Sequence, residues 1–439
     1  MNTSIDAVWA RVRSQKDALP GLYGDVDFDA TPERFTDDPA LSLTPEPAFA
    51  GPAPTAHDIE LVRAYTMMGD LVADAYAALM PEYGFRRLVA MLEDACDRGV
   101  ANVHGAPSEL VAFIRAMEQT PAWLDMDQVR EGARLDRNSA ANIAPIAIRG
   151  TFVATFLNKY AALPMALTGA LSSATAARRV KETASFFTTT VLPGALDRYG
   201  PGFKAAAMVR LMHSMVRFNA LRRSNRWDVG VYGIPIPQVD QMPAGLIPVV
   251  IMASRAIKQG RGFTAEERAR VEFSRYRCFL LGLPDDLLAD TPERIVQIMA
   301  ARNTTLRAGF DDETCGELIR GTLGAYLPPD ESLPNRVFDE VEKRFSRVFF
   351  LRTFLDGDRR RAAEMGVDVG LADYATYAAL AGLVVGNLTA YRAAMRLPLL
   401  RDVADKVLVM RLERQLKRYG HAAYTTDASQ YRPAGRAAA

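Results

Sequence analysis

From about residue 57 to residue 421 the chain carries an almost unbroken series of helix signals. Thr264, followed three residues later by Glu267, forms a capping box, which is a typical helix start. Thr291 before Pro292 is an N-cap with proline at the first helical position. No alternating apolar and polar runs joined by hairpin turns occur, and no repeat of fixed period is found. We therefore predict an all-α fold.

The chain divides into three parts by composition. Residues 1–56 combine a short amphipathic helix with a segment that holds seven prolines and many aspartates, which predicts an arm that wraps the core, covers an entrance or reaches a partner subunit. Residues 57–424 are expected to form a single large helical domain, with a long amphipathic helix over about 335–355. The polar end, 425–439, is expected to fray. Exchange of the arm between chains would give a homo-oligomer.

Charge and cysteine usage exclude some functions. The chain has 53 basic and 52 acidic residues, a net charge of +1, whereas nucleic-acid binding favours a net basic protein. The three cysteines form no C-x-x-C pair, so a common zinc site is excluded and a reducing compartment is expected. The N-terminus lacks the apolar core of a signal peptide. The apolar runs at 243–254 and 374–389 fall short of the ~18–20 residues of a spanning helix. We expect a cytoplasmic protein with no transmembrane segment.

Several catalytic motifs are absent from the sequence. It contains no phosphate-binding loop of the G-x-x-x-x-G-K type, no H-E-x-x-H zinc motif and no G-x-S-x-G nucleophile elbow. Nucleotide, zinc-hydrolase and serine-hydrolase functions therefore lack their minimum parts.

The segment from Arg137 to Lys181 contains no aspartate and no glutamate. Its other residues are mostly small or apolar. Helices that are apolar nearly all round lie in the core or form the walls of a pocket. We expect this segment to do one or the other.

The strongest chemical signal is the helical stretch 201–223, in which Arg210, His213 and Arg217 share one face. Two buried guanidinium groups need either two carboxylates or one doubly anionic ligand. Small side chains beside the histidine would let a flat group lie against the helix. Haem meets these demands, because its iron takes an imidazole ligand and its propionates can pair with arginine. The alternative is a core histidine with a hydrogen bond, flanked by arginines that pair with acids or tether helices.

The other histidines offer no metal site. His57, His104 and His421 have no metal-ligand partner at helical spacing. Each is expected to be a surface or capping residue.

Three motifs resemble the latex clearing protein (rubber oxygenase) family, which includes the MpaB-type oxygenases. They are R-L-M-H-S-M-V-R at 210–217, the upstream pair Arg179 and Thr183, and W-D-x-G-x-Y-G-I-P-I-P-Q-V-D at 227–240. The resemblance covers roughly 60–400. It implies an all-α fold with a globin-like core, haem b as cofactor, and oxygen-dependent cleavage of isoprenoid double bonds.

The resemblance also implies roles for single residues. His213 would be the iron ligand, and Arg210 and Arg217 match the arginines that flank it. Arg179 and Thr183 match positions on a helix that borders the haem pocket. Thr183 would donate a hydrogen bond to dioxygen.

The sequence departs from the rubber-cleaving branch at two positions. That branch has a lysine just before the threonine, where this chain has Glu182. The branch's candidate base, a glutamate about twenty residues upstream, aligns with Leu163. Glu182 would either replace the base, with a pKa raised by burial, or pair with Arg178 or Arg179 on its own helix. The polyisoprene mechanism is therefore not carried over.

Three functional hypotheses remain. The first is a haem b (iron) oxygenase that acts on a small apolar, isoprenoid-like substrate with dioxygen. The second is a haem-binding sensor or carrier without turnover, supported by the missing acid in 137–181. The third is a helical scaffold without a cofactor, which predicts a colourless protein.

Overall fold

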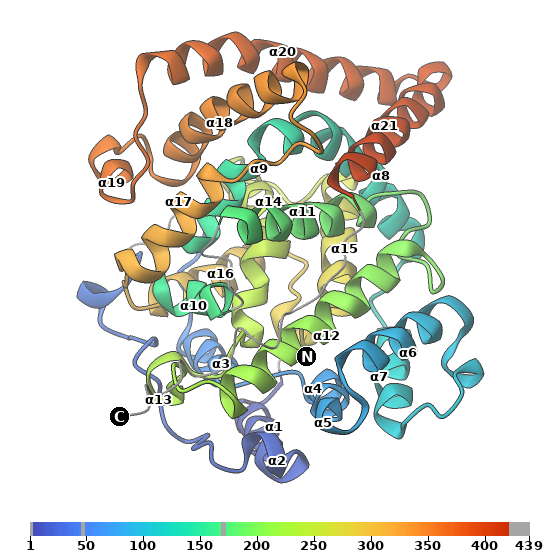
Figure 1. Ribbon diagram of the computed structural model, residues 1–439, viewed down its shortest axis with the longest axis vertical. Coiled ribbons are helices and arrows are strands. Elements are labelled where there is room, and N and C mark those ends of the chain that lie inside the picture. Colours follow the sequence, from blue (N-terminus) through green and yellow to red (C-terminus); the bar gives the residue numbers. More distant parts are fainter. Residues whose placement is uncertain (1–2, 45–48, 168–172, 421–439) are drawn as a thin grey trace. The chain divides into compact units, whose positions relative to one another are not determined.

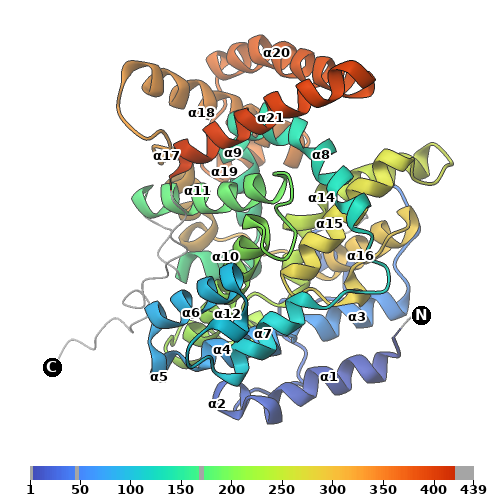
Figure 2. The ribbon, with the colours of Figure 1, turned by 90° about the vertical axis from the view of Figure 1, so that its right-hand side faces the viewer.

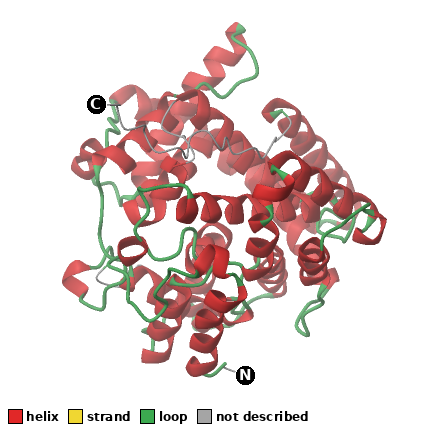
Figure 3. Ribbon diagram, turned by 60° about the horizontal axis from the view of Figure 1, so that its bottom comes forward, coloured by secondary structure: helices red, strands yellow, loops and turns green. Residues whose placement is uncertain are grey.

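The computed structural model describes residues 3–44, 49–167 and 173–420. Over these ranges it consists of helices joined by loops and contains no β-strand (Figure 3). The all-α class predicted from the sequence is confirmed. The predicted tail at 425–439 and His421 lie outside the described residues.

The chain folds into two compact units. Among the described residues, unit 1 comprises 3–44, 49–132 and 196–308, and unit 2 comprises 133–167, 173–195 and 309–420. Each unit is described by itself. The domain boundaries predicted at 56/57 and 424/425 stay a prediction.

Unit 1 holds the N-terminal helices and the central helices of the chain. Its elements are α1 (Ile5–Ala18), α2 (Pro20–Tyr23), η1 (Pro39–Leu41), α3 (Ala56–Thr66), α4 (Leu71–Ala78), α5 (Met80–Tyr83), α6 (Phe85–Arg98), η2 (Val100–Asn102), α7 (Ser108–Glu118), α12 (Pro201–Arg222), α13 (Val229–Tyr232), α14 (Gln238–Lys258), α15 (Ala265–Leu280), η4 (Asp285–Leu287) and α16 (Pro292–Thr305).

Unit 2 holds the remaining helices, and α8 crosses the boundary between the units. The elements are α8 (Met126–Asn142), α9 (Ala144–Val153), η3 (Ala154–Phe156), α10 (Lys159–Leu167), α11 (Ser173–Thr190), η5 (Asp312–Gly316), α17 (Glu317–Gly324), α18 (Leu333–Phe354), α19 (Arg359–Glu364), α20 (Leu371–Arg396) and α21 (Pro398–Tyr419).

The local helix signals act as the sequence predicts. At the start of α15 the Glu267 amide donates to the Thr264 hydroxyl at 3.2 Å, and the Thr264 amide donates to the Glu267 carboxylate at 2.8 Å. Thr291 caps α16, whose first residue is Pro292. The amphipathic helix expected over 335–355 is α18.

The N-terminal arm packs on unit 1. In α1 the Trp9 indole donates to Glu60 of α3 at 2.7 Å. Farther along, Arg34 makes a two-point ion pair with Asp240 of α14, at 2.7 and 2.8 Å. Two single β-bridges join the extended part of the arm to the segment after α16. These contacts agree with an arm that wraps the core, and the roles of covering an entrance or reaching a partner subunit stay predictions.

The acid-free segment supplies core helices of unit 2. Within α9, η3 and α10, the side chains of Phe152, Phe156 and Tyr160 are buried. These elements pack against α17, α18 and η5. This agrees with the expectation of a central core.

Helix α20 is longer than the apolar run at 374–389 suggested. It extends over 26 residues, Leu371–Arg396, and is the one helix among the described residues that is long and apolar enough to cross a membrane by length and composition. Only 6% of its most apolar window is buried. Figures 1 and 2 both show α20 beyond α18, on the side away from α9.

Candidate functional site

The site predicted around His213 is built on α12 in unit 1. Gly200 precedes the helix and Pro201 occupies its first turn, where a missing N–H costs nothing. From Gly202 to Ala220 most side chains are buried. The helix therefore lies in the core of unit 1, next to α4, and its polar side chains need partners there.

Both arginines of α12 pair with aspartates of the segment that starts α4. Arg210 forms a two-point pair with Asp70, in which Nη2 lies 2.9 Å from Oδ1. The Nε of Arg217 lies 2.8 Å from Oδ1 of Asp74. All four side chains are buried. The contacts correspond to the alternative in which the arginines tether neighbouring helices, since carboxylates of the chain itself occupy the guanidinium groups.

Further hydrogen bonds complete the surroundings of Arg217. Its Nη1 donates to the Ile236 carbonyl at 2.8 Å, and its Nη2 donates to the Ser214 hydroxyl at 3.0 Å. The Tyr23 hydroxyl donates to Asp74 Oδ2 at 2.5 Å. We call Tyr23, Asp70, Asp74, Arg210 and Arg217 the α12 cluster.

Two glycines make the α12 cluster sterically feasible. A Cβ on Gly282, which has φ +90°, would lie 2.6 Å from Asp70 Oδ2 and 2.7 Å from Arg210 Nε. A Cβ on Gly69 would lie 2.7 Å from Asp74 Oδ2. Any side chain at either position would displace a buried charged group.

Charges and burial set the pKa values of the cluster. Burial would raise the pKa of Asp70, but the charges of Arg210 and Arg217 hold it below its usual range. Burial raises the pKa of Asp74, and the neighbouring Asp70 adds to this against the charge of Arg217. Burial and Asp74 also keep Tyr23 protonated, because they raise the pKa of its hydroxyl.

His213 lies within this electrostatic environment. Burial, and then the charge of Arg217, lower the pKa of the imidazole to about 4. The ring is therefore neutral at pH 7, the state in which a histidine ligates a metal. Its Nδ1 is shielded from solvent and has no hydrogen-bond partner among the described residues. In the neutral ring one nitrogen carries the proton and the other keeps a lone pair that can bind a metal.

A chain of two glutamines leads to the His213 ring. Gln238 donates to the Gly69 carbonyl at 2.9 Å, and Gln241 donates to the Gln238 side chain at 3.0 Å. The Oε1 of Gln241 is buried without a partner in the described part of the chain, and Gln241 raises the pKa of His213 against the burial and the Arg217 charge that lower it. A small movement would let Gln241 accept from Nδ1–H and fix the tautomer whose Nε2 is free.

The single imidazole fits the chemistry of a haem site. No group of three or more His, Cys, Asp or Glu side chains that could hold a metal ion occurs in the described ranges. Haem iron is held by its porphyrin, and one proximal histidine completes the set of protein ligands. A neutral imidazole with one nitrogen available therefore meets the requirement.

The other predicted residues lie on α11 in unit 2. Arg179 and Glu182 are buried, and Thr183 is half-buried. The Nη1 of Arg179 lies 2.9 Å from the Glu182 carboxylate, so the pairing alternative is the one observed. Burial still raises the pKa of Glu182 against the charges of Arg179 and Arg178. The other Glu182 oxygen is buried without a hydrogen bond among the described residues.

The structure assembles the predicted site residues in two groups. Arg210, His213 and Arg217 belong to unit 1, whereas the α11 residues belong to unit 2. In the loop after α12, Asp228 caps α13 by accepting from the Gly230 amide at 2.8 Å. Arg222 pairs with Asp25 at 2.8 Å.

A second buried ionic cluster, missed by the sequence analysis, lies in unit 2. Arg149 pairs with Asp339 and Glu342 of α18, and the Ser346 hydroxyl donates to Glu342 at 2.6 Å. Lys343 lies 2.8 Å from Asp339. We call Arg149, Asp339, Glu342 and Ser346 the Arg149 cluster. An arginine in an acid-free apolar helix was the available signal, because its charge requires carboxylates from elsewhere.

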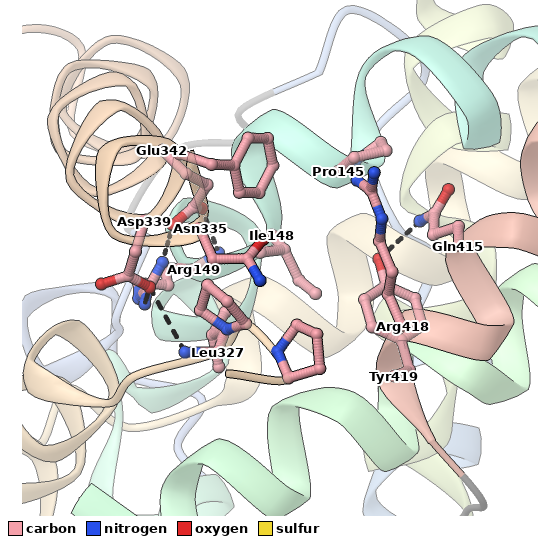
Figure 4. Close-up of a pocket in the computed structure, with 13 residues that line it drawn as sticks. Pro145, Ile148, Arg149, Leu327, Asn335, Asp339, Glu342, Gln415, Arg418 and Tyr419 are labelled. Carbon is pink, nitrogen blue, oxygen red and sulfur yellow. Dashed lines mark hydrogen bonds and ion pairs between the residues drawn. The ribbon is translucent and has the colours of Figure 1, made fainter. Parts of the chain in front are cut away.

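Arg149, Asp339 and Glu342 of this cluster form one wall of a cavity (Figure 4). Pro145, Leu327 and Tyr419 line other parts of it. Its volume is about 60 Å³, far below the ~300–1,000 Å³ of small-molecule pockets. We therefore interpret this cluster as a structural link between α9 and α18.

Comparisons with known proteins bear on both groups of residues. A family model described as "ER-bound oxygenase mpaB/B'/Rubber oxygenase, catalytic domain" matches residues 141–386, which include all six predicted site residues. The structure is similar to that of latex clearing protein in the closed state, with a TM-score of 0.54 and 18% identity over 87% of this chain and 95% of that chain. At this identity the likeness concerns the fold. No curated protein matches the chain.

Proposed function

Because the chain belongs to the family of MpaB-type and rubber oxygenase catalytic domains, we propose that it is a haem b-dependent oxygenase. Its substrate would be a small apolar, isoprenoid-like molecule that is oxidised or cleaved with dioxygen. The observation that carries the proposal is the neutral imidazole of His213, whose Nδ1 is buried without a partner among the described residues.

His213 would hold the cofactor through Nε2. Haem b supplies an iron that binds and activates dioxygen. The chain's own contribution is to fix the imidazole: the pairs Arg210–Asp70 and Arg217–Asp74 lock α12 against α4. Gln241 would orient the ring through Nδ1.

Residues of α11 would hold and transfer protons during the reaction. Burial raises the pKa of Glu182, so its carboxyl would hold a proton at a higher pH than an exposed glutamate does. The ion pair with Arg179 holds the Glu182 carboxylate against α11, the helix that carries both residues. Thr183 offers a hydroxyl that can donate a hydrogen bond to a reacting oxygen.

A second candidate function is a haem-binding sensor or carrier without turnover. The ion pair of Glu182 with Arg179 supports it, because this carboxylate is engaged and residues 137–181 contain no acid that could replace it. Both functions share His213 as the ligand, so they differ in oxygen consumption and not in cofactor binding.

The first experiment is the absorption spectrum of the purified chain, before and after addition of haem. We expect a Soret band that His213→Ala abolishes or shifts. The matched control is His104→Ala, since His104 is exposed in a loop, and it should leave the band unchanged. A chain that stays colourless with added haem would refute both haem functions.

A second experiment separates the oxygenase from the carrier. Oxygen uptake and carbonyl products would be measured with geraniol as a probe alkene. Loss of turnover in Thr183→Val and Glu182→Gln, with an intact Soret band, would support the oxygenase and the α11 assignments. Equal turnover in both variants would remove these assignments. If several apolar alkenes give no turnover, the carrier is favoured.

A further inference from the structure

Helix α20 exposes apolar surface along nearly its whole length. Between Asp373 and Arg392 it contains no charged residue. Of its 26 residues only Asp373 and Met395 are buried. Leu371 at its start is 90% exposed, and no atom lies within 4 Å of a Cβ placed on Gly382 or Gly386. A helix that is apolar all round is normally covered by other structure.

The turn from α20 to α21 extends this apolar surface. Its sequence is Arg-Leu-Pro-Leu-Leu-Arg, from Arg396 to Arg401. The side chain of Leu399 is 91% exposed, and Leu397 and Leu400 are exposed as well. Soluble monomers rarely keep large apolar patches open to water. We call α20 with residues 397–403 the α20–α21 surface.

Basic residues follow the apolar part of α20 along the chain, in its last turns and in α21. Helices α20 and α21 together carry eight lysines and arginines against four aspartates and glutamates. Two of the four acids are already in ion pairs, Asp373 with Arg347 at 3.3 Å and Asp405 with Arg137. The two helices therefore carry a net positive charge.

We propose that the α20–α21 surface docks on a lipid bilayer that contains anionic phospholipid. Exposed leucines flanked by arginines match the chemistry of such a surface: the apolar side chains enter the acyl boundary and the cations meet the headgroups. The proposal concerns binding and does not depend on the haem function.

Helix α20 docks flat and does not span the bilayer. Its inner side packs on α18, where the Tyr377 ring stacks on Phe345 at 4.8 Å. The pair of Asp373 with Arg347 also holds it there. Spanning would break these contacts and leave the charged helix α18 without its cover.

A second copy of the chain fits the surface less well. A two-fold dimer through α20 would bring two identical basic surfaces together, and like charges across an interface cost binding energy. The face of one 26-residue helix is ~39 Å long with a footprint of roughly 400 Å², half of the ~800 Å² per partner in a stable dimer.

Flotation of the full chain with lipid vesicles tests the proposal. The probes are vesicles of phosphatidylcholine alone and of phosphatidylcholine with phosphatidylserine in equal amounts. Binding should be stronger to the anionic vesicles and should weaken with salt. The double variant Leu399→Gln/Leu400→Gln should bind at least about tenfold more weakly. Lys406→Gln should lose about fivefold on anionic vesicles alone, the equivalent of one cation at the membrane surface.

Matched substitutions in unit 1 control for general effects. Leu41 and Lys16 are exposed there, and Leu41→Gln and Lys16→Gln should bind as the wild type does. Circular dichroism and the unfolding temperature of each variant check that the fold is intact.

Three results would overturn the proposal. The first is no flotation with either vesicle. The second is vesicle binding that resists alkaline extraction, which indicates a spanning helix. The third is a dimer in solution that Leu399→Gln/Leu400→Gln converts to a monomer without any vesicle binding, which assigns the surface to a second copy.

Discussion

The α12 cluster and the Arg149 cluster are two solutions to the same physical problem. Each buries arginine beside carboxylates from a distant part of its unit. Each also leaves one buried nitrogen nearby without a hydrogen bond among the described residues: Nδ1 of His213 in one case, and Nε of Arg149 in the other. The clusters differ in what that nitrogen can do.

The Nε of an arginine can only donate, because the guanidinium stays protonated in proteins. An imidazole that is neutral at pH 7 has one N–H and one lone pair, and either nitrogen can carry the proton. In the environment of His213, which lowers its pKa to about 4, the imidazole therefore keeps a lone pair, the feature on which the proposed ligand role depends. The Arg149 cluster provides a link between helices. The pair of clusters shows that burial and charge density alone do not identify a functional site.

The largest expected effect is the loss of the central arginine of the Arg149 cluster. Arg149→Met should reduce the free energy of unfolding by about 3–5 kcal/mol, because Glu342 would stay buried without its partner. The double variant Arg149→Met/Glu342→Met should recover part of this loss. Urea unfolding measures both. A loss below about 1 kcal/mol in the single variant would mean that water reaches these carboxylates and that the cluster is not a structural link.

A smaller effect of opposite sign is expected at His213. In the haem-free chain, His213→Leu should raise the free energy of unfolding by roughly 1–3 kcal/mol, since it removes a buried nitrogen that lacks a partner. The same variant should lose haem binding. His104→Leu, in an exposed loop, is the control and should change stability by less than ~0.5 kcal/mol. Destabilisation by His213→Leu would instead identify a satisfied core histidine.

Local signals in the sequence predicted the helices well. The box of Thr264 with Glu267, and Thr291 before Pro292, start α15 and α16 as expected, because caps act within one turn. The buried face of α12 could likewise be derived from spacing. Arg210 and Arg217 were predicted to need either two carboxylates or one doubly anionic ligand, and in the structure Asp70 and Asp74 supply the carboxylates.

The identity of the partners could not be derived from the sequence. Asp70 lies 140 residues before Arg210, and Asp339 lies 190 residues after Arg149. Spacing constrains neighbours on one helix but not pairs formed by tertiary packing. The exposure of α20 was missed for the same reason. Periodicity marks an apolar helix, yet whether its outer side is covered depends on the whole unit.

A substitution at Gln241 should affect the surroundings of His213 less than a substitution of His213 itself. If it orients the His213 ring, Gln241→Met should weaken haem binding about tenfold, as for other residues that orient a metal ligand. The Soret band should shift while the fold is kept. Gln128→Met, at an exposed position of α8, is the matched control. Haem affinity equal to wild type in Gln241→Met would leave the imidazole positioned by packing alone.

The smallest effect is expected at Glu267, a carboxylate that belongs to neither cluster. Its substitution gives the reference size of a single-carboxylate effect on stability, against which variants of both clusters can be compared. Hydrogen bonds from Arg261 and Thr264 outweigh burial and lower the pKa of Glu267 to about 2. Its contribution to stability is complete above the ordinary glutamate pKa and is lost as the pH falls towards 2. Glu267→Gln should cost roughly 0.5–1 kcal/mol at pH 7, the size of a helix-capping contact. Unfolding of both proteins between pH 7 and pH 2 should converge at the acidic end. A difference that persists at low pH would show that packing, and not the carboxylate charge, stabilises the start of α15. Stability changes of this size in variants of the two clusters could then not be assigned to their charges.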